Sequence, residues 1–260
     1  MNKLTNISKS AKIGNNLKID SFSSIHDNVI IGDNCWIGSN VTIYPGARIG
    51  SECKIFPGAV ISAIPQDLKF QGEETTTIIG NGVIIRECVT INRGTSYNNT
   101  TIIEDNAFLM AYSHVAHDCI IKNNVIIANG VAIAGHVEID EYAIIGGLSA
   151  IQQFSKIGKF SMISGGSLVR KDVPPYVKAA REPLAYVGIN SVGLRRRGFK
   201  SSRIVDIQNI YRILYQKKYN NTQALEIIAA ELNPTPERDE IIQFIESSQR
   251  GIMKGYFQKS

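Results

Sequence analysis

The sequence is poor in the features that mark exported, membrane-spanning or metal-binding chains. Its longest nearly apolar stretch, AIIGGLSAI at residues 143–151, is too short to cross a bilayer. No basic segment followed by an apolar run opens the chain. The four cysteines form no CxxC pair and no cluster with histidine. We therefore expect a cytoplasmic protein with reduced thiols, no transmembrane segment, no metal and no other cofactor.

Negative charge is scarce in one part of the chain. From Arg170 to the C-terminus there are 16 Lys and Arg against 9 Asp and Glu, a net of +7, whereas residues 1–169 carry a net of −2. A basic end on a slightly acidic body indicates an anionic partner. On charge alone, nucleic acid, a phosphorylated small molecule and an acidic carrier protein all fit.

What the chain does have is an aliphatic residue at every sixth position. Ten isoleucines from Ile7 to Ile61 keep this spacing, and between positions 7 and 169 only Asp67, Glu73 and Tyr97 interrupt it. A helix of 3.6 residues per turn could not hold such a column on one face, whereas six is a multiple of the strand period of two. The pattern predicts short strands joined by tight turns, wound as a prism around this column.

The position four after each aliphatic residue is usually small, which predicts a second inward column. Cys35 and Cys53 belong to it and are 18 residues apart, so they should stack in adjacent coils, about 5 Å from one another. We interpret them as small apolar core residues, although a disulfide between them is conceivable.

This repeat resembles that of the hexapeptide-repeat proteins over roughly residues 1–175. In that family three hexapeptides make one triangular coil of a left-handed parallel β-helix, so the resemblance implies a mainly β fold of this kind. General rules for parallel crossovers would favour the opposite hand. Two polar stretches, residues 62–77 and 92–101, cannot keep the column, and we expect them to project as loops.

Beyond residue 175 the sixfold period is lost and helical patterns take its place. Segments 201–218, 221–232 and 235–248 begin at capping residues and carry apolar residues at helical spacing. The sequence therefore predicts two domains, a β-helix over 1–175 and a small basic α-helical domain over 176–260.

Two of the four histidines, His114 and His117, lie three apart in the segment SHVAHDC. Both should point outward from the prism, where a solvated side chain without a role is the ordinary case. One coil further along, the neighbour of His117 is Gly135, and the next is Gln153. Glycine lets a ligand approach the backbone, and its N–H could stabilise an oxyanion, although Gly135 could equally be a simple corner residue.

A histidine beside an exposed amide is the arrangement that acyl transfer needs. An imidazole titrates near pH 6.5 and can accept a proton from an acceptor hydroxyl. No serine elbow is present, and Cys119 falls on the inward column, so no nucleophile is evident. Direct transfer with His117 as general base is the simpler mechanism.

Five motifs narrow the resemblance: NRGT, AHDC, IAGHV, DVPPY and RRRGF occur in this order. With the loop QDLKF and the helical end, they make almost the whole chain similar to the UDP-N-acetylglucosamine O-acyltransferase family of lipid A biosynthesis. The resemblance implies transfer of an (R)-3-hydroxyacyl chain from acyl carrier protein to the sugar 3-hydroxyl. It also implies a homotrimer and no nucleic-acid partner.

The resemblance assigns roles to residues of this chain. His117 is similar to the family's general base, Asp118 to its orienting partner and Gly135 to the oxyanion amide. Gly165 matches the position that sets acyl length, and a glycine there implies a chain on the order of 14 carbons or more. The expected substrate-binding residues are polar, which suits a sugar or a diphosphate: Asp67, Lys69, His114, His136, Gln153, Asn190, Arg196 and Arg197.

The chain departs from the family pattern at two positions, where Asn92 and Gln152 stand in place of expected histidines. Neither is the proposed base, so the chemistry is expected to survive while the sugar contacts differ.

Three other functions remain open on the sequence. A related N-acyltransferase would act on a sugar amine, but it usually has an additional N-terminal domain, and the repeat here already starts at Ile7. A zinc carbonic anhydrase on the same prism would use His114, His117 and His136 as ligands. A non-catalytic β-helix would leave the loops and the basic end unexplained.

Overall fold

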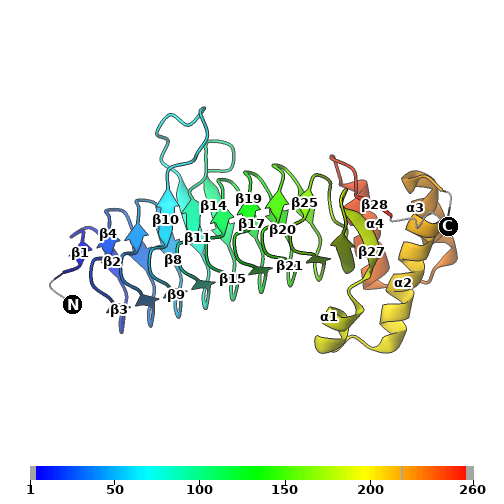
Figure 1. Ribbon diagram of the computed structural model, residues 1–260, viewed down its shortest axis with the longest axis horizontal. Coiled ribbons are helices and arrows are strands. Elements are labelled where there is room, and N and C mark those ends of the chain that lie inside the picture. The colour runs from blue at the N-terminus through cyan, green and yellow to red at the C-terminus, as the bar shows by residue number, and fades with distance from the viewer. Residues whose placement is uncertain (1–3, 218, 256–260) are drawn as a thin grey trace.

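The structure, a computed structural model, describes residues 4–217 and 219–255. A long three-sided prism occupies most of the chain, and a helical end closes it beyond the last coils (Figure 1). Most strands are two residues long and pair in parallel with the strands one coil before and after, so that they form three sheets, named A, B and C below.

Sheet A consists of β1 (Asn6–Ile7), β4 (Ser24–Ile25), β7 (Thr42–Ile43), β10 (Val60–Ala63), β13 (Thr90–Asn92), β16 (His114–Val115), β19 (Ala132–Ile133), β22 (Ala150–Ile151) and β25 (Leu168–Val169). Sheet B consists of β2 (Lys12–Ile13), β5 (Ile30–Ile31), β8 (Ala47–Ile49), β11 (Thr76–Ile79), β14 (Thr100–Ile103), β17 (Ile120–Ile121), β20 (Glu138–Ile139) and β23 (Lys156–Ile157). Sheet C consists of β3 (Lys18–Ile19), β6 (Trp36–Ile37), β9 (Lys54–Ile55), β12 (Ile84–Ile85), β15 (Phe108–Leu109), β18 (Ile126–Ile127), β21 (Ile144–Ile145), β24 (Met162–Ile163), β26 (Val177–Ala180), β27 (Ala185–Ile189) and β28 (Lys254–Gly255).

The aliphatic column predicted from the sequence is the core of the prism. Its residues are buried from Ile25 to Val169, and only the first coil leaves its isoleucines partly exposed at the open end. Cys35 and Cys53 are buried free thiols of the second inward column. The interpretation of these cysteines as core residues is therefore confirmed.

At the corners between sheets the chain turns through residues with a positive φ. Asp118 and Asn124 both have φ of 59° and His136 has 60°. Asparagine and aspartate tolerate this conformation better than most side chains, which explains their frequency at this place in the repeat. The backbone of each corner is thus set by the repeat, whatever side chain it carries.

Two loops leave the prism, residues 64–75 between β10 and β11 and residues 93–99 between β13 and β14 (Figure 1). They lie within the two stretches predicted to project and are a few residues shorter. Because of the longer loop, Ile61 pairs with Ile91, thirty residues further on, rather than with the residue eighteen further on. Paired strands on either side of a loop are therefore further apart in the sequence than paired strands elsewhere in the prism.

The helical end contains α1 (Ser191–Arg196), α2 (Ser201–Gln216), α3 (Asn221–Glu231) and α4 (Pro236–Glu246). The three predicted helices are confirmed to within two residues, whereas the short α1 was not predicted. Sheet C also continues past residue 175, because β26 pairs in parallel with β24 and then in antiparallel fashion with β27. Among the described residues, no helix combines the length and apolar character that crossing a membrane requires.

Candidate active site

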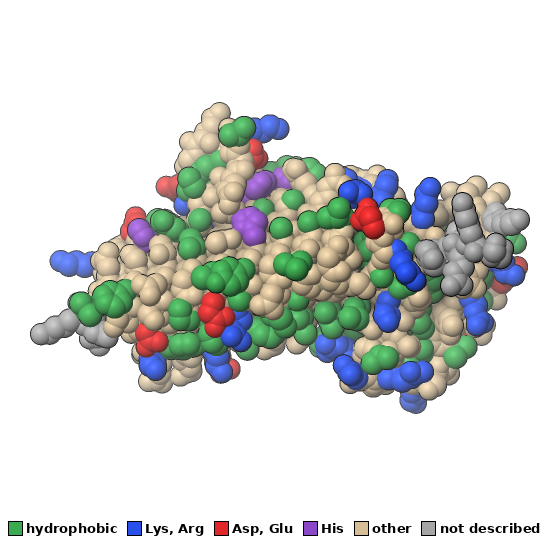
Figure 2. All heavy atoms as spheres, viewed as in Figure 1, with side chains coloured by type: hydrophobic (Ala, Val, Ile, Leu, Met, Phe, Trp, Pro, Cys, Tyr) green, Lys and Arg blue, Asp and Glu red, His purple; other side chains and the backbone are tan. Residues whose placement is uncertain are grey.

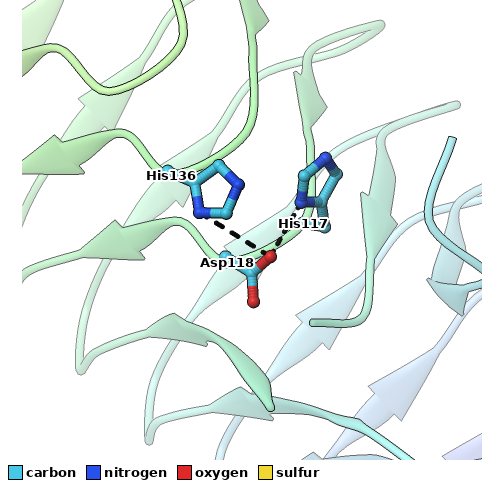
Figure 3. A group of neighbouring side chains, drawn as sticks. All are labelled: His117, Asp118 and His136. Atoms are coloured by element: carbon cyan, nitrogen blue, oxygen red, sulfur yellow. Dashed lines mark hydrogen bonds and ion pairs between the residues drawn. The ribbon is translucent and has the colours of Figure 1, made fainter. Parts of the chain in front are cut away.

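His117 and Asp118 occupy the corner between β16 and β17. The side chain of His117 points away from the prism core, as predicted, but only 8% of the residue is exposed. The side chain is therefore not solvated, because Asp118, Gly135 and His136 surround the imidazole. The 93–99 loop covers Asp118 at the same corner. His117 Nδ1 lies 2.8 Å from Asp118 Oδ2, and Figure 3 shows the carboxylate between two imidazole rings.

The carboxylate of Asp118 is fully satisfied by hydrogen bonds. Oδ1 accepts from the backbone N–H of Thr95 at 3.0 Å and of Asn98 at 3.2 Å. Oδ2 accepts from the hydroxyl of Thr95 at 2.6 Å and from His117. Burial alone would raise the pKa of Asp118, but the hydrogen bonds from Thr95 and His117 outweigh it and hold the pKa below its ordinary value.

This arrangement fixes the tautomer of His117. An ionised carboxylate can only accept hydrogen bonds, so Nδ1 of the neutral ring carries the proton and Nε2 is unprotonated. His117 can therefore accept a proton at Nε2 while Asp118 stabilises the resulting imidazolium.

Gly135 stacks against His117 from the next coil, as the 18-residue spacing predicts. A Cβ on Gly135 would lie 2.6 Å from His117 Cε1 and 2.8 Å from Nε2, so the imidazole occupies the space that any side chain here would need. The carbonyl of Gly135 accepts from the N–H of Phe154 at 3.2 Å. Between the residues that the structure describes, no hydrogen bond uses the N–H of Gly135, which leaves this donor for a ligand.

His136 follows Gly135 and lies on the other side of Asp118 (Figure 3). Its ring stacks on Phe154 at 4.4 Å between centroids and meets the edge of Tyr97 at 4.5 Å. Nδ1 is buried without a hydrogen-bond partner, 3.8 Å from Asp118 Oδ2. Burial lowers the pKa of His136; the charges of Asp118 and Asp67 oppose this shift.

His117, Asp118 and His136 bring three possible ligand atoms within 4.8 Å of one another, so a metal has to be considered. A tetrahedral zinc at about 2.0 Å from each ligand holds its ligand atoms roughly 3.3 Å apart and requires a deprotonated nitrogen. Nδ1 of His117 is instead a donor at 2.8 Å from Oδ2. The contact between His117 and Asp118 is therefore that of a histidine–carboxylate hydrogen bond and not that of two ligands of one zinc ion.

A cleft of about 540 Å³ opens beside this corner, with His136, Tyr97 and Phe154 at one end and Lys156 and Arg250 further along. On the face drawn in Figure 2, histidine side chains lie beside the projecting loops and also nearer the N-terminal end, and Lys and Arg side chains are more frequent towards the helical end. The cleft therefore combines an aromatic part with charged side chains of both signs, since Asp118, Glu138 and Asp172 line it together with Lys156 and Arg250.

Of the other predicted residues, His114, Asp67 and Gln153 lie close to this corner, and Lys69 follows Asp67 in the 64–75 loop. His114 on β16 places Nδ1 2.7 Å from the hydroxyl of Thr90, and burial together with the charge of His117 lowers its pKa. Asp67 accepts from the backbone N–H of Lys69 at 2.9 Å, and its charge reaches His136. Lys69 and Gln153 are exposed, Gln153 one coil beyond Gly135.

The remaining predicted residues lie at other corners. Asn190 caps α1, accepting from Gly193 and donating to the carbonyl of Phe160 at 2.9 Å. The guanidinium of Arg197, next to the exposed Arg196, lies 4.0 Å from the ring centre of Tyr142, at the corner between β20 and β21.

Gly165 lies at a corner where the chain passes from sheet C to sheet A, between β24 and β25. The corner of His117 joins sheet A to sheet B, and the corner of Tyr142 joins sheet B to sheet C. One chain therefore distributes the predicted site over three corners of the prism and brings only part of it to His117.

Asn92, where a histidine was expected, has a structural contact in this chain. It is buried, and its Nδ2 donates to the carbonyl of Ile64 at 3.0 Å, which ties the 64–75 loop to β13. Its Oδ1 is buried without a hydrogen-bond partner. Gln152, the second replacement, is exposed beside Gln153.

Sequence analysis missed Thr95, Tyr97 and Phe154 as parts of the site. Phe154 could have been found, because it lies 18 residues after His136 and therefore stacks on it in the next coil. The contact of Thr95 with Asp118 depends on the path of the 93–99 loop, for which the repeat gives no register.

Cys119 directly follows the pair but offers no nucleophile. Its side chain is buried in the core, and burial raises the pKa of the thiol to about 12. Among the described residues, this corner thus brings together an imidazole and an amide N–H without an exposed thiol beside them.

The sixfold repeat, the prism fold and the arrangement of residues around His117 together define a class of protein, the hexapeptide-repeat transferases. A sequence profile described as bacterial transferase hexapeptide (six repeats) matches residues 10–35, 28–63 and 100–135. A second profile, described as UDP-N-acetylglucosamine O-acyltransferase, domain 2, matches residues 172–253.

Full-length relatives identify the family. The acyl-carrier-protein–UDP-N-acetylglucosamine O-acyltransferase of Sulfurihydrogenibium sp. is 50% identical over 95% of this chain and 91% of its own length. The enzyme of the same name from Aquifex aeolicus is 56% identical over 75% of each chain. The crystal structure of the UDP-N-acetylglucosamine acyltransferase from Bacteroides fragilis matches with a TM-score of 0.97 and 49% identity, covering 98% of this chain and 100% of that one. The chain belongs to the UDP-N-acetylglucosamine O-acyltransferase family; it is an acyltransferase, and its prism is a left-handed parallel β-helix.

Proposed function

We propose that the protein transfers an (R)-3-hydroxyacyl chain from acyl carrier protein to the 3-hydroxyl of UDP-N-acetylglucosamine, the first step of lipid A biosynthesis. The observation that carries the proposal is the pairing of His117 with Asp118 directly above Gly135. A base with a fixed tautomer and an amide N–H beside it are the two groups that acyl transfer to a hydroxyl needs. The names of the full-length relatives supply the donor and the acceptor.

The proposed mechanism is direct attack. Nε2 of His117 takes the proton of the sugar hydroxyl while the hydroxyl oxygen bonds to the thioester carbonyl carbon. The N–H of Gly135 donates to the oxyanion. When the carbon–sulfur bond breaks, the leaving thiolate takes the proton from the imidazolium, which restores the neutral base. A positioned base contributes roughly 10²–10⁴ in rate, and one oxyanion donor about 3 kcal/mol.

Acyl transfer is tested directly by incubating the protein with (R)-3-hydroxyacyl carrier protein and UDP-N-acetylglucosamine and by identifying the product by mass and by the position of its ester. A parallel reaction with a UDP-sugar that carries a 3-amine distinguishes O-acylation from N-acylation. Competing donors of different length measure the chain preference that Gly165 is proposed to set. Absence of ester with every donor would contradict the proposal.

Substrate binding is proposed to require a second and a third copy of the chain. Asn190, Arg196, Arg197 and Gly165 lie at corners other than that of His117. A prism wall separates these corners, so residues from both can meet one substrate only if neighbouring prisms supply them. We propose a homotrimer with its sites between prisms. There Asp67, Lys69, His114, His136 and Gln153 of one copy would face the arginines and Gly165 of the next.

Mixed oligomers test this arrangement. His117→Ala and the double variant Arg196→Ala/Arg197→Ala are each expected to be weakly active alone. After the two are unfolded together and refolded, sites that combine an intact His117 with intact arginines from a different copy should restore part of the activity. Refolding each variant by itself is the control. Failure of the mixture to exceed the two separate variants would contradict a shared site.

The basic end is proposed to bind the donor. Acyl carrier proteins are acidic, and the segment from Arg170 onward carries a net charge of +7. The apparent Michaelis constant for the carrier should rise with ionic strength, whereas that for the sugar nucleotide should change less. If the apparent Michaelis constant for the carrier did not change with ionic strength, this part of the proposal would be contradicted.

A further inference from the structure

The NRGT motif contains a residue that the proposed mechanism leaves without a role. Thr95 is 7% exposed and contacts Asp118 twice, through its N–H at 3.0 Å and its hydroxyl at 2.6 Å. The hydroxyl bond ends on Oδ2, the oxygen that also accepts from His117. The two donors therefore share one carboxylate oxygen.

Thr95 is held by its own loop in the orientation that this contact needs. Its hydroxyl oxygen accepts from the N–H of Tyr97 at 3.2 Å, and its carbonyl accepts from the N–H of Asn99 at 2.7 Å. Because the oxygen already accepts from Tyr97, its own proton points to Asp118. A continuous chain of hydrogen bonds thus runs from the 93–99 loop through Thr95 and Asp118 to the imidazole of His117.

We propose that Thr95 is a positioning residue of the reaction, whose hydroxyl holds the Asp118 carboxylate and adjusts how readily His117 takes up a proton. This inference depends on the proposed role of His117 as the base. A second donor on Oδ2 draws negative charge away from the bond to Nδ1, so the carboxylate stabilises the imidazolium less than a bare carboxylate would. Loss of the Thr95 hydroxyl should therefore strengthen the hydrogen bond between the carboxylate and the imidazolium.

Other titratable groups also face His117 and have to remain constant in a test. Asp118 lies beside it on the same corner, His136 from the next coil lies 5.0 Å away between ring centres, and His114 on β16 interacts with it through charge. Asp67 acts on His136 from the 64–75 loop. Removing the Thr95 hydroxyl leaves all of these groups in place and changes only one hydrogen bond to Asp118, so a change in pH dependence reports on the carboxylate contact.

The test compares pH profiles of kcat/KM for wild type, Thr95→Val and Thr95→Ser. Valine keeps the size of threonine and removes the hydroxyl, whereas serine retains it. Thr95→Val should lower kcat by roughly tenfold and shift the acid limb upward by about half a pH unit to one unit, with little change in either KM. Thr95→Ser should return the limb to its wild-type position.

Thr101→Val is the matched control. The hydroxyl of Thr101 accepts from the backbone N–H of Asp118 at 2.9 Å, so its loss disturbs the same residue without touching the carboxylate. The acid limb of the pH profile of Thr101→Val should stay at its wild-type position even if kcat falls. If Thr95→Val does not fold, Thr95→Ala removes the same donor with a smaller side chain and takes its place in the comparison.

The possible results distinguish failure of the proposed role of Thr95 from failure of the proposed function. An active wild type with an acid limb that does not move in Thr95→Val would overturn the role of Thr95 and leave the base intact. Equal shifts in Thr95→Val and Thr95→Ser would also overturn it, because serine retains the donor. If the wild type fails to transfer any acyl chain, the proposed function fails instead.

Discussion

Two successive corners of the prism have the same backbone and different surroundings. Asp118 and Asn124 both follow a strand of the repeat by three residues and both have φ of 59°. Asp118 is buried under the 93–99 loop and bound to His117, whereas Asn124 is half-buried and lies beneath no projecting loop.

The residues that directly precede these two positions, His117 and Asn123, also have different partners. His117 pairs with a carboxylate, while Asn123 accepts from the N–H of Asp105 at 3.1 Å and donates to Glu104 at 2.9 Å, linking one coil to the previous one. The comparison teaches that the repeat supplies the corner and that the inserted loop turns one corner into a site. The proposed function of this corner therefore depends on what covers the backbone, since the backbone itself is shared.

The largest effect is expected from removing His117, the proposed base. His117→Ala should reduce acyl transfer by roughly 10²–10⁴, because a positioned general base contributes about that much to the rate. Asn123→Ala is the matched control, at the same position of the repeat one strand later, and should keep nearly full activity. Steady-state assays of both variants, with circular dichroism to verify folding, make the comparison. Equal losses in the two would show that the corner is structural only.

The next effect in size concerns the space below the imidazole. Gly135→Ala would place a Cβ 2.6 Å from His117 Cε1, so the ring has to move by about 1 Å. A displacement of this size at a reacting group costs roughly a hundredfold in kcat. Asn129 and Glu141 carry side chains at the equivalent positions of neighbouring corners, so the backbone alone tolerates the substitution.

A double-mutant cycle isolates the contact between the two residues. In a His117→Ala background, Gly135→Ala should cost little further activity and little stability, because its Cβ then has room. If Gly135→Ala reduced activity as much in the His117→Ala background as in the wild type, the loss would come from the Gly135 N–H and not from displacement of the imidazole.

Asp118→Asn should reduce kcat by roughly tenfold to a hundredfold, because the carboxamide no longer stabilises the imidazolium or fixes the tautomer. Stability provides an independent measurement. Since the pKa of Asp118 is lowered in the folded state, its contribution to stability is complete above about pH 4 and is lost as pH falls through the folded value. The difference in melting temperature between wild type and Asp118→Asn should therefore narrow below about pH 4. A difference that widens on acidification would be inconsistent with an ionised, hydrogen-bonded carboxylate.

Periodicity made one part of the structure predictable from the sequence. The column from Ile25 to Val169, the stacking of Gly135 on His117 and the three longer helices all depend on local spacing, and all are found. A fixed repeat length makes each neighbour in space calculable. The same reasoning placed His117 on an outward wall but could not show that a loop covers Asp118 beside it.

The features that the sequence did not predict are set by segments without a period. The contacts of Thr95 with Asp118 and of Asn92 with Ile64 depend on how two loops fold back on the prism, which is determined by tertiary packing. The short helix α1 was missed because six residues are too few to show a helical pattern. The continuation of sheet C beyond residue 175 was missed because β26 no longer keeps the sixfold register.

The smallest effect concerns the backbone that the two corners share. Asn124→Ala places alanine at φ of 59°, which should cost about 1 kcal/mol of stability without loss of acyl transfer. Asn124→Gly should recover that stability, because glycine adopts this conformation without steric cost. Thermal unfolding and activity measured on the same preparations separate the two properties. If activity fell with Asn124→Ala and returned with Asn124→Gly, corner strain would reach the site through the coils. In that case the backbone of one corner would contribute to the function of the next.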